Sequence, residues 1–107
     1  MPKYLFNASL TMDGVKGTMK EGGSARRDAV VKAIESLGGK AEAYYYAFGE
    51  SDVVGIADMP DNVSAAAFAL LVTVAGGAEV STTVLLTPEE VDKIAKKTAD
   101  YRPPGKS

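Results

Sequence analysis

The stretch from Lys40 to Asp58, KAEAYYYAFGESDVVGIAD, constrains the fold more than any other part of the chain. Its first half is rich in tyrosine, its second half in small and β-branched residues, and Gly49-Glu50-Ser51-Asp52 separates them. Aromatic and β-branched runs on either side of a short turn containing Gly and Asp are typical of a β-hairpin. The pattern therefore predicts two adjacent antiparallel strands at the centre of a sheet.

The segment before this hairpin predicts a strand and a helix. Residues 2–10 alternate, with Tyr4 and Phe6 on the more apolar face, which indicates a half-buried strand. Residues 11–20 are expected to form only a loose turn or two, because each glycine in a helix costs about 1 kcal/mol relative to alanine. A helix follows from Ser24, its expected N-cap, to the stop at Gly38-Gly39.

The segment after the hairpin predicts a helix, a strand and a second helix. Residues 63–75 have no charged side chain and are apolar on both sides of a helix, so we expect the outer side to meet another element or another subunit. Residues 79–86 read as a strand. Thr87-Pro88-Glu89-Glu90 then combines an N-cap, a proline at the first position and a capping-box glutamate, which predicts a helix start.

The order of these elements predicts an α+β fold of the ferredoxin-like type, βαββαβ, with an extra C-terminal helix. Residues 1–100 form the expected domain, and residues 101–107 an extended tail that its prolines keep out of the helix. Such a sheet has helices on one face only. The less apolar strand positions are Asn7, Ser9, Ser81 and Thr83 rather than lysine or glutamate, so we expect the second face to be covered by a partner subunit.

Composition excludes several classes of function. The chain has no histidine and no cysteine, which excludes cysteine nucleophiles, Ser-His triads, zinc sites built from those residues, and haem ligation by them. A net charge of −2 with scattered basic residues argues against nucleic acid as a partner. The uncharged stretch is too short for a membrane span. We expect a cytoplasmic protein without a metal or other cofactor.

Arg26 and Arg27 are the first candidate ligand-binding residues. They follow Gly22-Gly23-Ser24 at a helix start, where free backbone amides and two guanidinium groups could hold a phosphate or carboxylate. The alternative, which we weight more heavily, is that both side chains are solvated or pair with Glu21, Asp28 or Glu50.

Tyr44 and Tyr46 are the next candidates, since alternation places them on one strand face together with Phe48. They could line an apolar pocket and offer hydroxyl groups, although packing in a core or subunit interface is the commoner role of such residues. Asp52 is expected to hold the hairpin turn, with Gly49 at positive φ. The nearby carboxylates lack the spacing of a known metal-binding loop, so no metal site is expected.

Six blocks of the sequence resemble, in order, the GYD-domain family of small bacterial proteins. They are MPKYLFNASLT, EGGSARRDAV, SLGGKAEAYYYAFGESDVV, IADMPDNVSAAA, LLTPEEVDKIAKK and YRPPG. The resemblance implies a dimeric α+β barrel, in which two ferredoxin-like subunits press their sheets together. Gly49 and Asp52 match the family signature, whereas Ser51 stands where its tyrosine is expected. Related barrels include cofactor-free monooxygenases, haem enzymes and ligand-sensing modules, so the resemblance implies no particular reaction.

These observations support three hypotheses about function. The first is a homo-oligomeric module that binds a small molecule between sheet and helices or between subunits, associating through the sheet face and helix 63–75. The second is a cofactor-independent enzyme of the monooxygenase or isomerase type, acting on a small apolar or aromatic substrate with Tyr44, Tyr46, Asp52 or Asn7 as polar groups. The third is a purely structural subunit with a filled core. A dimer is expected, and a trimer built edge to edge stays open.

Overall fold

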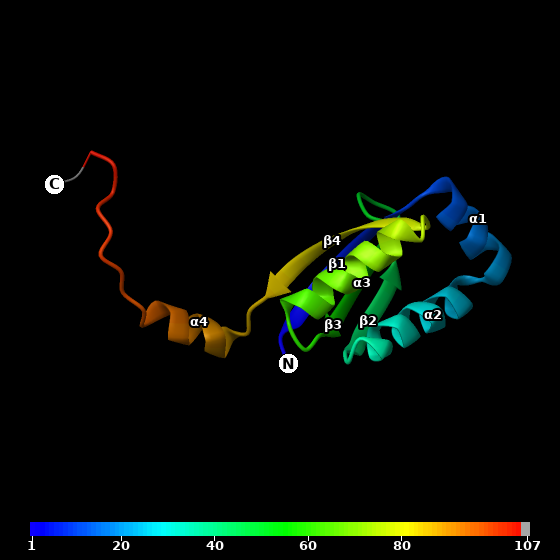
Figure 1. Cartoon of the computed structure of the whole chain (residues 1–107). Coiled ribbons are helices and arrows are strands. Elements are labelled where there is room, and N and C mark those ends of the chain that lie inside the picture. The colour runs from blue at the N-terminus through cyan, green and yellow to red at the C-terminus, as the bar shows by residue number, and fades with distance from the viewer. Residues whose placement is uncertain (106–107) are drawn as a thin grey trace.

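The computed structural model describes residues 1–105 and contains a four-stranded sheet and four helices (Figure 1). The chain order of these elements confirms the α+β arrangement expected from the sequence. The elements are β1 (Lys3–Leu10), α1 (Met12–Glu21), α2 (Gly23–Ser36), β2 (Lys40–Tyr46), β3 (Val53–Asp58), α3 (Asn62–Val74), β4 (Ala78–Leu85) and α4 (Pro88–Ala95).

The sheet has the strand order β2-β3-β1-β4, and every neighbouring pair is antiparallel. This is the ferredoxin-like topology. The predicted hairpin is present, but it does not form the centre of the sheet. β1 and β3 occupy the two central positions, because β1 pairs with β3 on one side and β4 on the other, which leaves β2 at an edge.

The hydrophobic core lies between the sheet and the helices α2 and α3, which cover the same sheet face (Figure 1). Tyr4 and Phe6 project into it from β1, Ile34 from α2 and Phe68 from α3. The rings of Phe6 and Phe68 meet edge to face with centroids 5.0 Å apart. Burial of these large side chains, each worth about 1.5–3 kcal/mol, holds the two layers together.

Two helix starts differ from the predictions. Residues 12–21 form a regular helix instead of a loose turn, because the Thr11 hydroxyl accepts a hydrogen bond from the Gly14 amide and caps it. Ser24 is not an N-cap. α2 begins directly after Gly22, which has φ +92° and serves as its N-cap residue. The stop at Gly38 is as predicted, with φ +83°.

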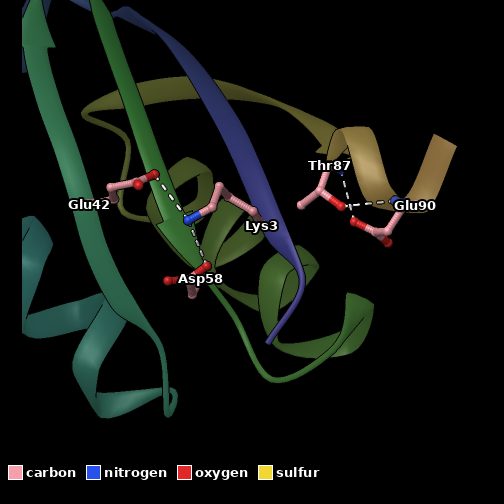
Figure 2. A network of polar contacts seen from close by, with 5 residues as sticks. All are labelled: Lys3, Glu42, Asp58, Thr87 and Glu90. Carbon is pink, nitrogen blue, oxygen red and sulfur yellow. Dashed lines mark hydrogen bonds and ion pairs between the residues drawn. The ribbon is translucent and has the colours of Figure 1, made fainter. Parts of the chain in front are cut away.

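The second face of the sheet has no helix over it in the described chain, and it is more charged than the sequence suggested. Lys3 donates to Asp58 at 3.0 Å and to Glu42 at 3.1 Å at one end of this face (Figure 2). Glu42 reaches Lys3 because a β-bulge interrupts β2 between Ala41 and Ala43. The hydrogen bond to Asp58, then the one to Glu42, raises the pKa of Lys3.

α4 extends away from the rest of the molecule, beyond the end of β4 (Figure 1). Its predicted capping box is present, since Thr87 and Glu90 exchange side-chain to backbone hydrogen bonds of 3.0 and 3.1 Å (Figure 2). The described chain therefore spans 62 Å in its longest dimension. Of the predicted tail, residues 106–107 lie outside the described residues. No helix within residues 1–105 has the length and apolar character needed to cross a membrane.

Candidate functional site

A cavity of about 240 Å³ lies between the sheet and the helices, beside the hydrophobic core. Its walls are mainly apolar, and its few polar side chains come from α1, α2 and β2. The apolar walls include Phe6, Val30, Val31, Ile34, Val53, Phe68 and Val72, and the polar side chains are Thr18, Arg26, Tyr44 and Tyr46. The site therefore combines an apolar interior with a small group of hydrogen-bonding residues.

Tyr44 and Tyr46 both face this cavity on the helix side of β2. Their ring centroids lie 5.4 Å apart in an edge-to-face arrangement. The Tyr46 hydroxyl donates to the Gly23 carbonyl of α2 at 3.0 Å, which ties the edge strand to the start of that helix. The structure thus decides which sheet face the two tyrosines occupy, a question that the sequence left open.

Phe48 does not share the position of the two tyrosines, contrary to the prediction from alternation. β2 ends at Tyr46, and Phe48 lies fully exposed in the loop that follows. Because the strand geometry stops two residues earlier, the period-2 argument does not apply to this side chain.

The pKa of Tyr44 is raised above its ordinary value of 10.0. Burial is the main cause, because the charged phenolate loses hydration. The neighbouring Tyr46 hydroxyl adds to the shift, while the positive charge of Arg26 opposes it. Tyr44 is therefore a protonated hydrogen-bond donor at neutral pH rather than a base.

Arg26 and Arg27 have different surroundings. Arg26 lines the cavity, and its guanidinium contacts Glu21 through a single nitrogen, Nη1, at 3.4 Å. Arg27 instead contacts Asp28 through Nε and Nη2 at 3.2 and 3.1 Å. Pairing with Glu21 and Asp28 is the alternative to ligand binding that the sequence analysis gave for these two arginines. Arg26 still has unused donors for a second anion, since guanidinium carries five N–H groups.

Asn7 and Asp52 lie away from the cavity. Asn7 pairs in register with Val54 and Ser81, on the face opposite the helices. The Asp52 carboxylate accepts a hydrogen bond of 2.8 Å from the Leu10 amide, and its backbone amide donates to the Ala8 carbonyl. Asp52 therefore anchors the hairpin loop to β1. Gly49 does not have the positive φ expected of it, because the link between β2 and β3 is a longer loop than a two-residue turn.

Sequence reasoning missed the contribution of α1 to the site. Gly14 and Thr18 line the cavity, and Thr18 donates its hydroxyl proton to the Gly14 carbonyl at 2.8 Å. The signal was present in Thr11, a good N-cap residue, but the two glycines of this segment outweighed it. Val30, Val31 and Ile34, which form an apolar stripe on α2, make another wall of the cavity.

The four carboxylates between Glu50 and Asp61 do not converge. Asp58 pairs with Lys3, Asp61 caps α3 by accepting from the Ser64 amide at 2.8 Å, and Asp52 binds β1. Residues 1–105 contain no group of three or more acidic side chains placed to hold a metal ion. The cavity is therefore the better candidate site, suited to an apolar molecule with one anionic or hydrogen-bonding group.

A sequence profile described as the GYD domain matches residues 4–95, from β1 to the end of α4. The chain belongs to the GYD-domain family. The match includes the cavity-lining segments of α1, α2 and β2, so the candidate site lies inside the GYD domain. Ser51 lies in the loop between β2 and β3. No curated protein and no solved structure matched the chain in the same comparisons.

Proposed function

We propose that this GYD-domain protein is a homo-oligomeric module that binds a small anionic molecule with an apolar body. The observation that supports the proposal is the cavity of about 240 Å³ with Arg26, Tyr44 and Tyr46 among its lining residues. Ligand sites typically combine apolar walls with a few polar groups that orient the ligand, and this cavity has that composition. A cytoplasmic location and a bacterial origin are predictions from the sequence.

The volume indicates the size of the ligand. A cavity of about 150 Å³ accommodates benzene, so the present one has room for roughly ten non-hydrogen atoms, such as one ring with a short substituent. Arg26 would pair with a carboxylate or phosphate group on that substituent, and the Tyr44 hydroxyl would donate a further hydrogen bond. The ring would pack against the apolar walls of the cavity.

The other two hypotheses have less support. Among residues 1–105 no acidic side chain lines the cavity, and Tyr44 is held in its protonated form, so the lining offers no general base for the enzymatic alternative. A purely structural subunit would be expected to fill its interior with side chains. The open cavity therefore favours a binding function.

Self-association through the uncovered sheet face is the second part of the proposal. Leu5, Val54, Ile56 and Leu85 project from this face and are only partly covered within one subunit. A second copy related by a twofold axis would cover them with the same face of its own sheet. This arrangement would also place the Lys3 cluster at the rim, where ion pairs are tolerated.

A matched pair of variants, Arg26→Ala and Arg27→Ala, tests the binding proposal with benzoate and benzamide as probes. Benzoate and benzamide have the same size, but only benzoate is charged. We expect Arg26→Ala to weaken benzoate binding about tenfold, since a charge-assisted hydrogen bond contributes about 1.5 kcal/mol. Arg27→Ala should leave it unchanged. Isothermal titration calorimetry measures both affinities, and benzamide binding should be weak and insensitive to either change.

Two outcomes would contradict the proposal. If both arginine variants bind benzoate as tightly as the original chain, the anion does not contact Arg26. If neither probe binds at millimolar concentration, and soaked crystals show no density between the sheet and α2, the cavity does not take a ligand of this class.

A further inference from the structure

The C-terminal arm, residues 86–95, presents an apolar seam to solvent. All eight residues of α4 are exposed, and Val91 and Ile94, which lie three residues apart on one side of it, are 49% and 51% exposed. Leu86, just before the helix, is 54% exposed. Isolated helices shorter than about 12–15 residues are marginal in water, so a helix of this length needs a surface against which to pack.

A groove between α3 and β4 offers such a surface. Its volume is about 340 Å³, and Ala66, Ala69, Leu70, Thr82 and Val84 form much of its lining. The alanines leave room for larger side chains from an approaching helix. The Tyr4 hydroxyl at the groove already donates to Asn62 Oδ1 at 2.6 Å, so these two polar atoms are paired with each other. The groove therefore suits an apolar occupant.

The link between β4 and α4 resists folding back onto the groove of its own subunit. Only Leu86 and Thr87 separate the two elements, and Thr87 is extended, with φ −76° and ψ +158°. Both Pro88 and the capping box require this extended conformation. Thr87 cannot be the second central residue of a type I or type II turn, which needs ψ near 0°, nor the first of a type II turn, because Pro88 cannot adopt positive φ.

The charge at the end of the arm favours one orientation on a second copy. Residues 1–86 contain seven basic and ten acidic side chains, a net charge of −3. The arm itself carries Glu89, Glu90 and Asp92 near its start, and the balance reverses only from Lys93 to Gly105, with Lys93, Lys96, Lys97 and Arg102 against Asp100. An arm that runs antiparallel to α3 of another copy would bring Lys93, and Lys96 and Lys97 just after the arm, toward Asp61 at the start of that helix. Attraction of this kind steers association and selects orientation.

We propose that the arm docks into the α3–β4 groove of a second copy, and that the two copies exchange arms reciprocally. Val91 and Ile94 fill the space above Ala66 and Ala69 of the partner, while the charged side of α4 stays in water. Exchange of a terminal element through a short link is a common route to a dimer. This inference rests on the proposed self-association only in requiring a second copy, and it does not depend on pairing of the sheets.

Crosslinking between singly substituted chains tests the exchange, because the sequence contains no other cysteine. An equal mixture of the Ala66→Cys chain and the Ala95→Cys chain is treated with a short bismaleimide and resolved by mass. Ala95 lies beside Val91 on the seam, so a product of dimer mass is expected. The matched control replaces Ala95→Cys by Lys93→Cys, on the opposite side of the helix, and should give little product.

The chain that carries both Ala66→Cys and Ala95→Cys separates the possible occupants. Exchange predicts crosslinked dimers from this chain as well. A crosslinked product of monomer mass would show that the arm occupies its own groove and would overturn the proposal. So would a mixture that yields no more dimer product than the Lys93→Cys control. A dimer held by sheet pairing alone would also give no more product than the Lys93→Cys control. The experiment can therefore reject arm exchange without rejecting the proposed pairing of the sheets.

Substitutions on the seam provide a second measurement in the full chain. Val91→Gln with Ile94→Gln should lower the crosslinking yield about tenfold, since two apolar contacts per arm are lost. Glu89→Gln with Lys93→Gln leaves the net charge unchanged, alters only the opposite side of α4, and should keep the yield. Equal yields from both pairs would overturn the proposal.

Discussion

Arg26 and Arg27 illustrate how adjacent residues of one helix acquire different roles. Successive side chains on a helix point about 100° apart, so two neighbours can face different surroundings. Arg26 faces the cavity, while Arg27 faces Asp28 and solvent. The pair consequently serves as an internal control, because the two variants remove the same charge from the same turn.

Tyr44 predicts a change of stability at alkaline pH. Its pKa in the unfolded chain is near the ordinary value of 10.0, and in the folded protein it is higher because of burial. Between these two values the folded state holds a proton that the unfolded state has lost, so the free energy of unfolding falls as the pH rises above about 10. We expect Tyr44→Phe to make this fall smaller.

Urea denaturation at pH 8 and above pH 10 measures the effect. Tyr45→Phe is the matched control, because Tyr45 lies on the opposite sheet face with 69% exposure. The control should keep the pH dependence of the original chain. A Tyr44→Phe variant with that same pH dependence would contradict the assignment of Tyr44 to a buried site.

At the scale of the element, alanine is expected to have opposite effects on stability at the two glycines of α1. A Cβ at Gly14 would overlap the Gly77 carbonyl oxygen, at the point where α1 meets the start of β4. That carbonyl also accepts a hydrogen bond of 3.1 Å from the Thr11 amide, so it cannot move freely. A Cβ at Gly17 would meet nothing within 4 Å.

We therefore expect Gly14→Ala to lower the free energy of unfolding by about 1–3 kcal/mol, as overpacking does. Gly17→Ala should raise it by about 0.5–1 kcal/mol, since alanine loses less backbone entropy in a helix. Urea denaturation of the two variants gives both values. If Gly14→Ala is as stable as Gly17→Ala, α1 does not approach β4 as described.

At the scale of the whole molecule, the uncovered sheet face predicts self-association. Val54 lies on β3, one of the two central strands, on the face opposite the helices. We expect Val54→Lys to weaken the dimer about 100-fold or more, because a twofold axis would bury two unpaired charges in one interface. Ser36→Lys, on an exposed position of α2, should have no effect.

Size-exclusion chromatography with light scattering measures the mass of each variant against the 11.1 kDa of one chain. Exchange of the arms would hold some dimer together in Val54→Lys. Its combination with Val91→Gln and Ile94→Gln should therefore be fully monomeric. A monomer of the original chain at micromolar concentration would contradict sheet pairing, and a mass of three chains would indicate the trimer.

The sequence by itself determined the order of the elements, the fold class and several element ends. These features depend on neighbours a few residues apart: alternation in β1, the apolar stripe of α2, the stop at Gly38 and the capping box at Thr87. Where local signals conflicted, as in α1, or where one residue decided a boundary, as at Ser24, the prediction was wrong.

Only the tertiary structure decided what those elements enclose. Strand pairing decides which sheet face carries Tyr44 and Tyr46, and it places Asn7 and Asp52 outside the cavity. The rotation of α2 decides that Arg26 rather than Arg27 lines the cavity. These are contacts between residues far apart in the chain, and local patterns do not encode them. The projection of α4 is the clearest case, because the start of this helix is predicted by its capping box whereas its exposure depends on where β4 ends and on the two-residue link that follows.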